Sequence, residues 1–191
     1  MRLFAAINLP EKVIDGLRRE QAKLAKFGDR LRLVDPSGLH MTLCFVGEVQ
    51  AQEVEVVEHG MRGALAGQSP FMLGLGEGGS FPRPDNARVV WVGVDGELRR
   101  LETIQKLIAD EMSSLGYRID RRPFSPHVTL ARASRNASSE DRRSIAESTV
   151  ELTGYRLGSF EVRSVDLMES IISRQGATYS TIAHISLIST D

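Results

Sequence analysis

One four-residue pattern occurs twice in this chain, as His-Met-Thr-Leu at residues 40–43 and as His-Val-Thr-Leu at residues 127–130. Side chains of a β-strand alternate between two faces, so on a strand the His and the Thr of each copy share one face. The Met, Val and Leu side chains then point the other way, into a hydrophobic core. Each copy therefore predicts a strand that buries one face and presents an imidazole and a hydroxyl on the other.

The duplication extends beyond the two patterns. The two histidines are 87 positions apart (127 minus 40), and shifting the chain by 87 without a gap aligns further residues of like character. The aligned pairs are Phe4 with Trp91, Ile7 with Val94, Ile14 with Leu101, Leu17 with Ile104, and Pro36 with Pro123. Each half contains a strand, an amphipathic helix, a proline-containing turn and a His-x-Thr strand, which indicates an internal repeat of residues 1–50 and 86–135. The alternative is a chance alignment of two ordinary strand–helix–strand units.

The hydrophobic periodicity predicts an α+β fold. We expect helices at 11–26, 51–65 and 98–115, a short helix within 134–148, and strands at 3–7, 39–47, 71–75, 88–94, 126–132, 160–168 and 181–188. Residues 76–84, rich in Gly and Pro, are expected to form a loop. We therefore predict one domain over residues 1–191, with two pseudo-symmetric lobes of antiparallel or mixed sheet, flanking helices and a central cleft.

Composition restricts the class of protein. A formal net charge of −1 excludes a globally basic nucleic-acid coat but allows a local basic site. The single cysteine, Cys44, excludes an internal disulfide framework and suits a reducing compartment. No apolar run is long enough to span a membrane, and Asn8 and Pro10 interrupt the first apolar segment too early for a signal peptide. We expect a cytoplasmic monomer with no membrane partner.

Two histidines on facing strands suit chemistry at phosphorus. The pKa of an unperturbed imidazole is near 6.5, so both protonation states are accessible at neutral pH. A neutral imidazole can take a proton from a nucleophile while a protonated one gives a proton to the leaving oxygen. Thr42 and Thr129 would add hydroxyl donors at a fixed distance from His40 and His127. The spacing matches no metal motif, and it leaves open which histidine is the donor.

Both patterns, together with much of the chain, resemble the two-histidine phosphoesterase superfamily, in particular the bacterial and archaeal RNA 2′,3′-cyclic phosphodiesterases, long called 2′-5′ RNA ligases. The segments that carry the resemblance are 2–7, 40–48, 90–93, 122–132, 169–170 and 176–179. The resemblance implies a bilobal fold and an enzyme that opens a 2′,3′-cyclic phosphate at an RNA end to a 2′-phosphate, without metal, cofactor or ATP. It also implies that His40 is the proton donor and His127 the proton acceptor.

Residues near the two patterns are further candidates. The resemblance implies that Arg132 contacts the phosphate, although strict alternation would place it on the face opposite His127, so a bulge or strand end must intervene. Otherwise Arg132 is ordinary surface charge. Phe124, in the turn before the second pattern, is expected to stack on a base, whereas Phe45 and Trp91 are expected to pack in the core.

Further arginines flank the patterns and could form a basic rim for RNA phosphates, although each one alone is typical surface charge. They are Arg30, Arg32, Arg121, Arg122 and Arg135. Among the other candidates, Cys44 would share the strand face of His40 but lie about 13 Å away, too far for a nucleophilic pair. We expect His59 to be an exposed helix residue and His184 to be structural.

Alternative functions remain. The same two histidines could join a cyclic-phosphate end to a 5′-hydroxyl through a 2′-5′ bond, or hydrolyse a small cyclic nucleotide. A non-enzymatic module that binds RNA ends would need the arginines but not two His–Thr pairs.

Overall fold

A computed structural model describes residues 1–83, 85–120, 122–154, 157–173 and 176–188. Its α-helices are α1 (Glu11–Lys23), α2 (Val54–Ala64), α3 (Leu98–Ser114) and α4 (Ser139–Glu147), and its 3₁₀ helices are η1 (Ala25–Arg30), η2 (Pro36–Gly38), η3 (Ala51–Glu53) and η4 (Ser148–Glu151). The strands are β1 (Arg2–Asn8), β2 (Leu31–Leu33), β3 (His40–Glu48), β4 (Phe71–Arg83), β5 (Asn86–Gly96), β6 (His127–Ala133), β7 (Ser159–Val162), β8 (Ser164–Ser173) and β9 (Gly176–Ser186). None of the described helices is long and apolar enough to cross a membrane.

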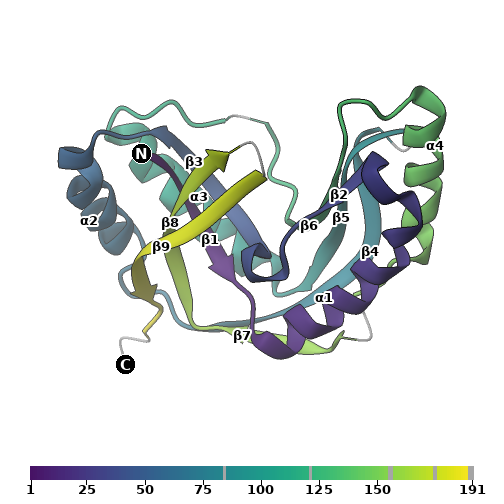
Figure 1. Ribbon diagram of the computed structural model, residues 1–191. Coiled ribbons are helices and arrows are strands. Elements are labelled where there is room, and N and C mark those ends of the chain that lie inside the picture. The colour runs from purple at the N-terminus through teal and green to yellow at the C-terminus, as the bar shows by residue number, and fades with distance from the viewer. Residues whose placement is uncertain (84, 121, 155–156, 174–175, 189–191) are drawn as a thin grey trace.

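The strands form one nine-stranded antiparallel sheet in the order β7-β4-β5-β6-β3-β1-β8-β9, with β2 paired to β6. The sheet is narrow in the middle, where β3 and β6 share a single residue pair, Met41 with Val128. On one side of this junction lie β1, β3, β8 and β9 with α2 and α3; we call this the first lobe (Figure 1). On the other side lie β2, β4, β5, β6 and β7 with α1 and α4, the second lobe (Figure 1). The predicted bilobal α+β fold with flanking helices is confirmed.

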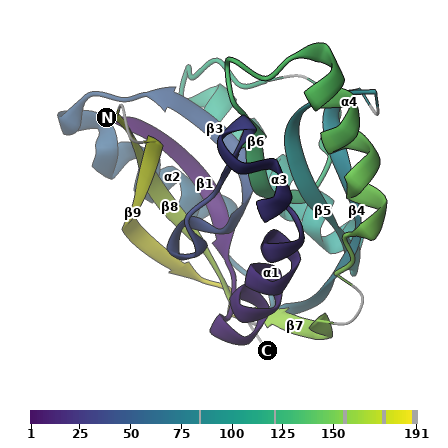
Figure 2. The ribbon, with the colours of Figure 1, turned by 45° about the vertical axis from the view of Figure 1, so that its right-hand side comes forward.

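Two helices tie the lobes together. Helix α1 follows a strand of the first lobe but packs in the second lobe (Figure 2), where the buried Gln21 amide donates to the carbonyl oxygens of Val34 at 2.7 Å and Leu130 at 2.9 Å. Helix α3 follows a strand of the second lobe but packs against β3 and α2 of the first. The chain therefore passes from one lobe to the other between β1 and α1 and again between β5 and α3, which links the two lobes.

The motif strands have the predicted inner face. Met41, Leu43, Val128 and Leu130 are all buried in one hydrophobic core. The first strands of the two halves do not follow the ungapped alignment, however. Thr42 pairs with Ala6, whereas Thr129 pairs with Trp91. Trp91 therefore corresponds to Ala6, and the alignment of Phe4 with Trp91 is wrong by two residues.

The loop predicted at 76–84 is also wrong, because residues 76–83 belong to a strand. Strand β4 continues to Arg83 along β5. Gly79 in this strand leaves room for a neighbouring side chain and does not form a turn. A Cβ at this position would lie 2.3 Å from the ring of Trp91. The predicted strand at 160–168 is divided between β7 and β8, and the first predicted helix ends at Lys23, where a 3₁₀ helix follows.

Candidate active site

Both strands that carry the His-x-Thr patterns bulge at the leucine that ends each pattern. In β3, Leu43 has no partner between the pairs that Thr42 and Cys44 make with β1. In β6, Leu130 likewise has no partner between the pairs that its neighbours make with β5. Such an extra residue shifts the alternation of the following side chains by one position. The residues after each bulge therefore change face.

This change of face decides which side chains reach the site. Arg132 follows the second bulge and lies on the face of His127. The phosphate contact implied by the resemblance required a bulge or a strand end before Arg132. Phe45, after the first bulge, is 52% exposed on the face of His40, so its predicted place in the core is wrong. Cys44 turns into the core, and its predicted position on the face of His40 is wrong as well. Burial raises the pKa of the Cys44 thiol to about 11, which disfavours the thiolate.

A cavity of about 420 Å³ lies where the two bulged strands meet. The four predicted residues all line it, because they flank the Met41–Val128 pair on the face opposite the core. Among the described residues, the lining consists of His40, Thr42, His127, Thr129, Arg132, Arg2, Phe4, Val34, Gly38, Phe45, Ser170, Ile172, Ala177 and Tyr179. These residues come from both lobes, so the cavity is a cleft between them.

The same backbone contact orients both imidazoles. Nδ1 of His40 lies 2.8 Å from the carbonyl oxygen of Gly38, and Nδ1 of His127 lies 2.7 Å from that of Ser125. A carbonyl oxygen only accepts hydrogen bonds, so Nδ1 carries the proton in each ring. Each Nε2 is then left to hold a lone pair in the neutral ring or a proton in the cationic ring. The two rings are prepared alike for proton transfer at Nε2.

Aromatic rings hold His40 in place. The ring of Phe4 lies 5.0 Å from the imidazole, and the ring of Tyr179 meets the imidazole edge-on at 4.7 Å. Phe4 and Tyr179 also contact each other at 5.7 Å. The sequence assigned neither residue a role, because their approach depends on the pairing of β1 with β3 and of β8 with β9.

His127 has an equivalent support from other strands. Phe81 meets its imidazole edge-on at 5.0 Å, and Trp91 lies 6.1 Å away and stacks on Phe81. Trp91 therefore lies beside the site, and its predicted place in the core is wrong. Its Nε1 is buried and has no hydrogen-bond partner in the part of the chain that the structure describes. Phe81, in the segment predicted as a loop, was missed.

The electrostatic surroundings favour neutral imidazoles. Burial is the largest cause that lowers the pKa of His40, and the charges of Arg132 and His127 lower it further against the raising effect of the Gly38 carbonyl. Burial also lowers the pKa of His127, again assisted by Arg132 and opposed by the carbonyl of Ser125. A bound phosphate would offset the charge of Arg132 and make protonation of one ring easier.

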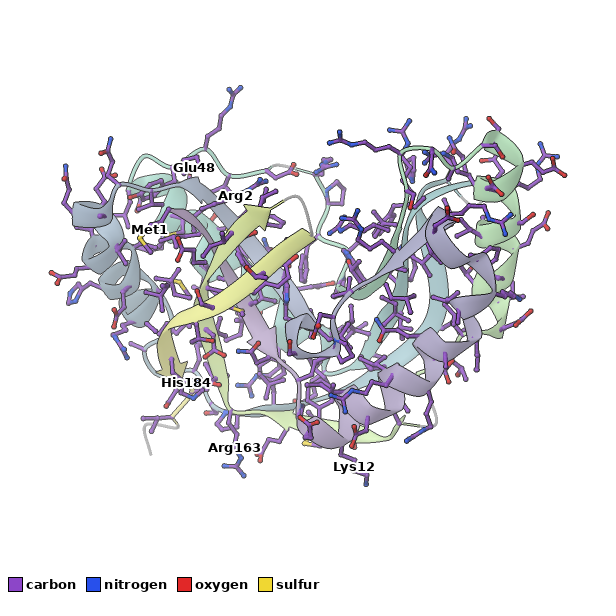
Figure 3. All side chains as sticks on the ribbon, in the orientation of Figure 1. Met1, Arg2, Lys12, Glu48, Arg163 and His184 are labelled. Atoms are coloured by element: carbon purple, nitrogen blue, oxygen red, sulfur yellow. The ribbon has the colours of Figure 1, made fainter. Side chains whose placement is uncertain are left out.

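The other predicted residues lie outside the cavity. Phe124 is partly buried against the core and does not line the cavity, so this placement does not support stacking on a base. His59 is exposed on α2, as predicted. His184 donates from Nδ1 to the buried Asp166 at 2.5 Å and lies at the lower edge of the first lobe, away from Arg2 (Figure 3).

The predicted basic rim is only partly present. Arg30 pairs with Asp141 and Arg122 with Asp120, so neighbouring carboxylates neutralise both. Arg32 and Arg135 are exposed. Arg121 lies outside the described residues.

A larger hollow of about 720 Å³ lies elsewhere, lined by Ser113, Tyr117, Arg118, Ile119 and Asp120. It contains no imidazole or thiol, so we assign the candidate active site to the smaller cleft. Across the described ranges, no three His, Cys, Asp or Glu side chains gather closely enough to hold a metal ion.

Comparison with known proteins agrees with this geometry. Residues 9–171 match the family model of the 2′-5′ RNA ligase superfamily. The chain belongs to this superfamily. The family resemblance predicted from the sequence is thereby confirmed, and the matched region contains both motif strands.

Relatives and solved structures of this superfamily match nearly the whole chain. The RNA 2′,3′-cyclic phosphodiesterase of Aeropyrum pernix is 34% identical over 91% of this chain and 96% of its own. That of Methanothermobacter thermautotrophicus is 31% identical over 94% of this chain and 95% of its own. The crystal structure of E. coli LigT complexed with 3′-AMP superposes with a TM-score of 0.77 at 28% identity, over 97% of each chain. The crystal structure of TT0787 of Thermus thermophilus superposes with a TM-score of 0.78 at 26% identity over both whole chains.

Proposed function

We propose that this chain hydrolyses the 2′,3′-cyclic phosphate at an RNA end and leaves a 2′-phosphate. The observation that carries the proposal is the pair of imidazoles in one cleft, each with Nδ1 bound to a backbone carbonyl and Nε2 left for proton transfer. The names of the relatives support the same activity, since both archaeal proteins described above are RNA 2′,3′-cyclic phosphodiesterases. The monomeric state expected from the sequence stays a prediction.

The proposed step is an in-line displacement at phosphorus. Water attacks the phosphorus as Nε2 of neutral His127 accepts its proton, and the bond between phosphorus and O3′ breaks. Nε2 of protonated His40 donates its proton to O3′, which leaves as the 3′-hydroxyl. One proton enters and one leaves the substrate, so the reaction ends with His40 neutral and His127 protonated, and exchange with solvent restores the starting state.

The remaining lining residues would bind the phosphate and the base. The hydroxyls of Thr42 and Thr129 and the guanidinium of Arg132 can donate to the non-bridging phosphate oxygens, where charge increases in the transition state. Phe45 presents an exposed ring at the edge of the cleft, 5.7 Å from that of Phe4, and takes the stacking role that the sequence assigned to Phe124.

An end-labelled oligonucleotide that terminates in a 2′,3′-cyclic phosphate tests the proposal. We expect conversion to the 2′-phosphate isomer in excess EDTA and without ATP, and conversion at least about 100-fold slower by His40→Asn or His127→Asn. Formation of the 3′-phosphate, or a requirement for added metal, would contradict the proposed mechanism.

A second RNA with a 5′-hydroxyl end, present in the same single-turnover reaction, tests the ligase alternative. The reverse reaction uses the same two histidines, but bulk water, which is in large excess, competes with the RNA hydroxyl. A ligated product that exceeds the hydrolysed one would favour the transferase activity.

A further inference from the structure

Two arginines face each other beside the cleft. Arg32 in β2 pairs directly with Arg132 in β6, so both side chains point to the same face of the sheet. Both are exposed, and Leu31 and Ala131, which precede them, are buried on the opposite face. Like charges directly opposite each other on a sheet destabilise it. The fold therefore keeps a repulsive pair next to its candidate active site.

Acidic residues do not offset this charge. In the portions of the chain covered by the structure, no carboxylate oxygen lies within ion-pairing distance of Arg32 or Arg132. On the other side of Arg132 its strand partner is Val89. The nearby Arg30 differs, because its guanidinium binds Asp141 at 3.0 Å. Two arginines paired on neighbouring strands, without a counter-ion among the described residues, favour binding of an external anion.

Only one arginine of the pair lines the cleft. Arg132 lines it, whereas Arg32 lies on the neighbouring strand β2, and neighbouring strands are about 4.8 Å apart. Because Arg32 does not line the cleft, it is available for a group of the substrate other than the phosphate between the two imidazoles. A substrate that satisfies both arginines carries a second phosphate close to its cyclic end.

We propose that Arg32, beside Arg132, binds the phosphodiester that precedes the terminal nucleotide, so the preferred substrate is an oligonucleotide and not a nucleoside cyclic monophosphate. This inference rests on the proposed function and assigns one residue that makes the same site prefer RNA to a mononucleotide. Contacts to the RNA backbone carry little base information, so the subsite would increase affinity without sequence preference.

The test compares two substrates that differ by one nucleotide, and therefore by one phosphodiester: adenosine 2′,3′-cyclic monophosphate and the dinucleotide ApA with a 2′,3′-cyclic phosphate. For the wild-type protein we expect a higher kcat/KM with the dinucleotide. Arg32→Gln should reduce the ratio of the two kcat/KM values about tenfold, as expected for one charge-assisted contact. Arg32→Lys should retain part of the preference, and Arg99→Gln, on the exposed side of α3, should leave the ratio unchanged.

Two further measurements separate binding from turnover and from folding. Arg32→Gln should weaken equilibrium binding of ApA carrying a 2′-phosphate about tenfold, and should make the slope of log affinity against log salt shallower by about 0.7. Its thermal midpoint without ligand should equal or exceed that of the wild type, because the substitution removes a repulsion.

Two outcomes would overturn the inference: an unchanged ratio of the two kcat/KM values, which includes an equal loss on both substrates, or undiminished binding of the dinucleotide. Each would leave the proposed hydrolysis intact if the wild-type protein still opens both cyclic phosphates. A wild-type protein that opens neither would instead contradict the proposed function, and the binding measurement would still decide whether Arg32 holds a phosphate.

Discussion

Met41 and Val128 pair with each other where β3 meets β6, and each is the counterpart of the other in the duplicated pattern, 87 positions apart (128 minus 41). Exchanging the two copies of the pattern maps this pair onto itself, so a pseudo-twofold axis through the pair relates the two motif strands. The histidine and threonine of each copy flank the axis on the open face. The two imidazoles therefore approach one cleft from opposite strands, as a proton donor and a proton acceptor require.

The histidine substitutions test this arrangement. His40→Asn and His127→Asn should each lower kcat about 10²–10⁴-fold, because each removes one proton-transfer group. The asparagine amide can still donate toward the carbonyl of Gly38 or Ser125, so the fold should be retained. Hydrolysis of a cyclic-phosphate oligonucleotide measures the effect, and circular dichroism checks folding. Activity within a few-fold of wild type in either variant would contradict the assignment.

The pH dependence of kcat/KM should be bell-shaped, with limbs that report the two histidines of the free protein. Arg132 lowers the pKa of both imidazoles, so Arg132→Gln should raise both and move both limbs to higher pH. A pH–rate series of the two proteins with a nucleoside cyclic phosphate measures the shift. Movement of the limbs to lower pH, or of one limb alone, would contradict the effect of the Arg132 charge on both imidazoles.

Stability should also depend on these two pKa values. Each folded-state pKa is lowered, so between that value and about 6.5 the unfolded chain binds more protons than the folded one. The free energy of unfolding should therefore decrease as pH falls below about 6.5. His127→Asn should remove part of this decrease, which urea titrations at about pH 7.5 and about pH 5.5, on either side of the unperturbed pKa, would detect. If the free energy of unfolding depended on pH in the same way in both proteins, this would contradict a pKa of His127 that burial lowers.

Phe45 should contribute to substrate binding rather than to folding. Because its ring is 52% exposed, Phe45→Ala should change stability by about 1 kcal/mol or less. Loss of one stacked base costs about 1–3 kcal/mol, so KM should rise about 5- to 150-fold for a substrate with a base. An abasic ribose 2′,3′-cyclic phosphate is the control, and an equal rise in its KM would argue against stacking.

Phe45 and Arg132 show what the sequence could predict and what it could not. They are equivalent positions of the duplication, and both reach the cleft because a leucine bulge precedes them. The resemblance gave Arg132 a phosphate contact, which required a bulge before it, and the structure has that bulge. Nothing polar marked Phe45, so strict alternation placed it in the core. Bulges depend on the partner strand, which local periodicity does not reveal.

Long-range pairing explains the other differences. The histidines, threonines and their inner-face neighbours follow from period-two alternation alone, and the α+β class follows from the spacing of the elements. Tyr179 and Phe81 reach the imidazoles through strands far away in sequence, and Gly79 is small because the ring of Trp91 covers it. The internal repeat of residues 1–50 and 86–135 stays a prediction.

A crystal structure of the protein bound to a nucleoside 2′-phosphate would test the central claim most directly, through the distances from each imidazole to the phosphate. We predict that Nε2 of His40 and Nε2 of His127 both lie about 2.6–3.2 Å from oxygens of the same phosphate or of the adjacent 3′-hydroxyl. A phosphate bound to only one of the two rings, or held elsewhere in the molecule, would contradict the account.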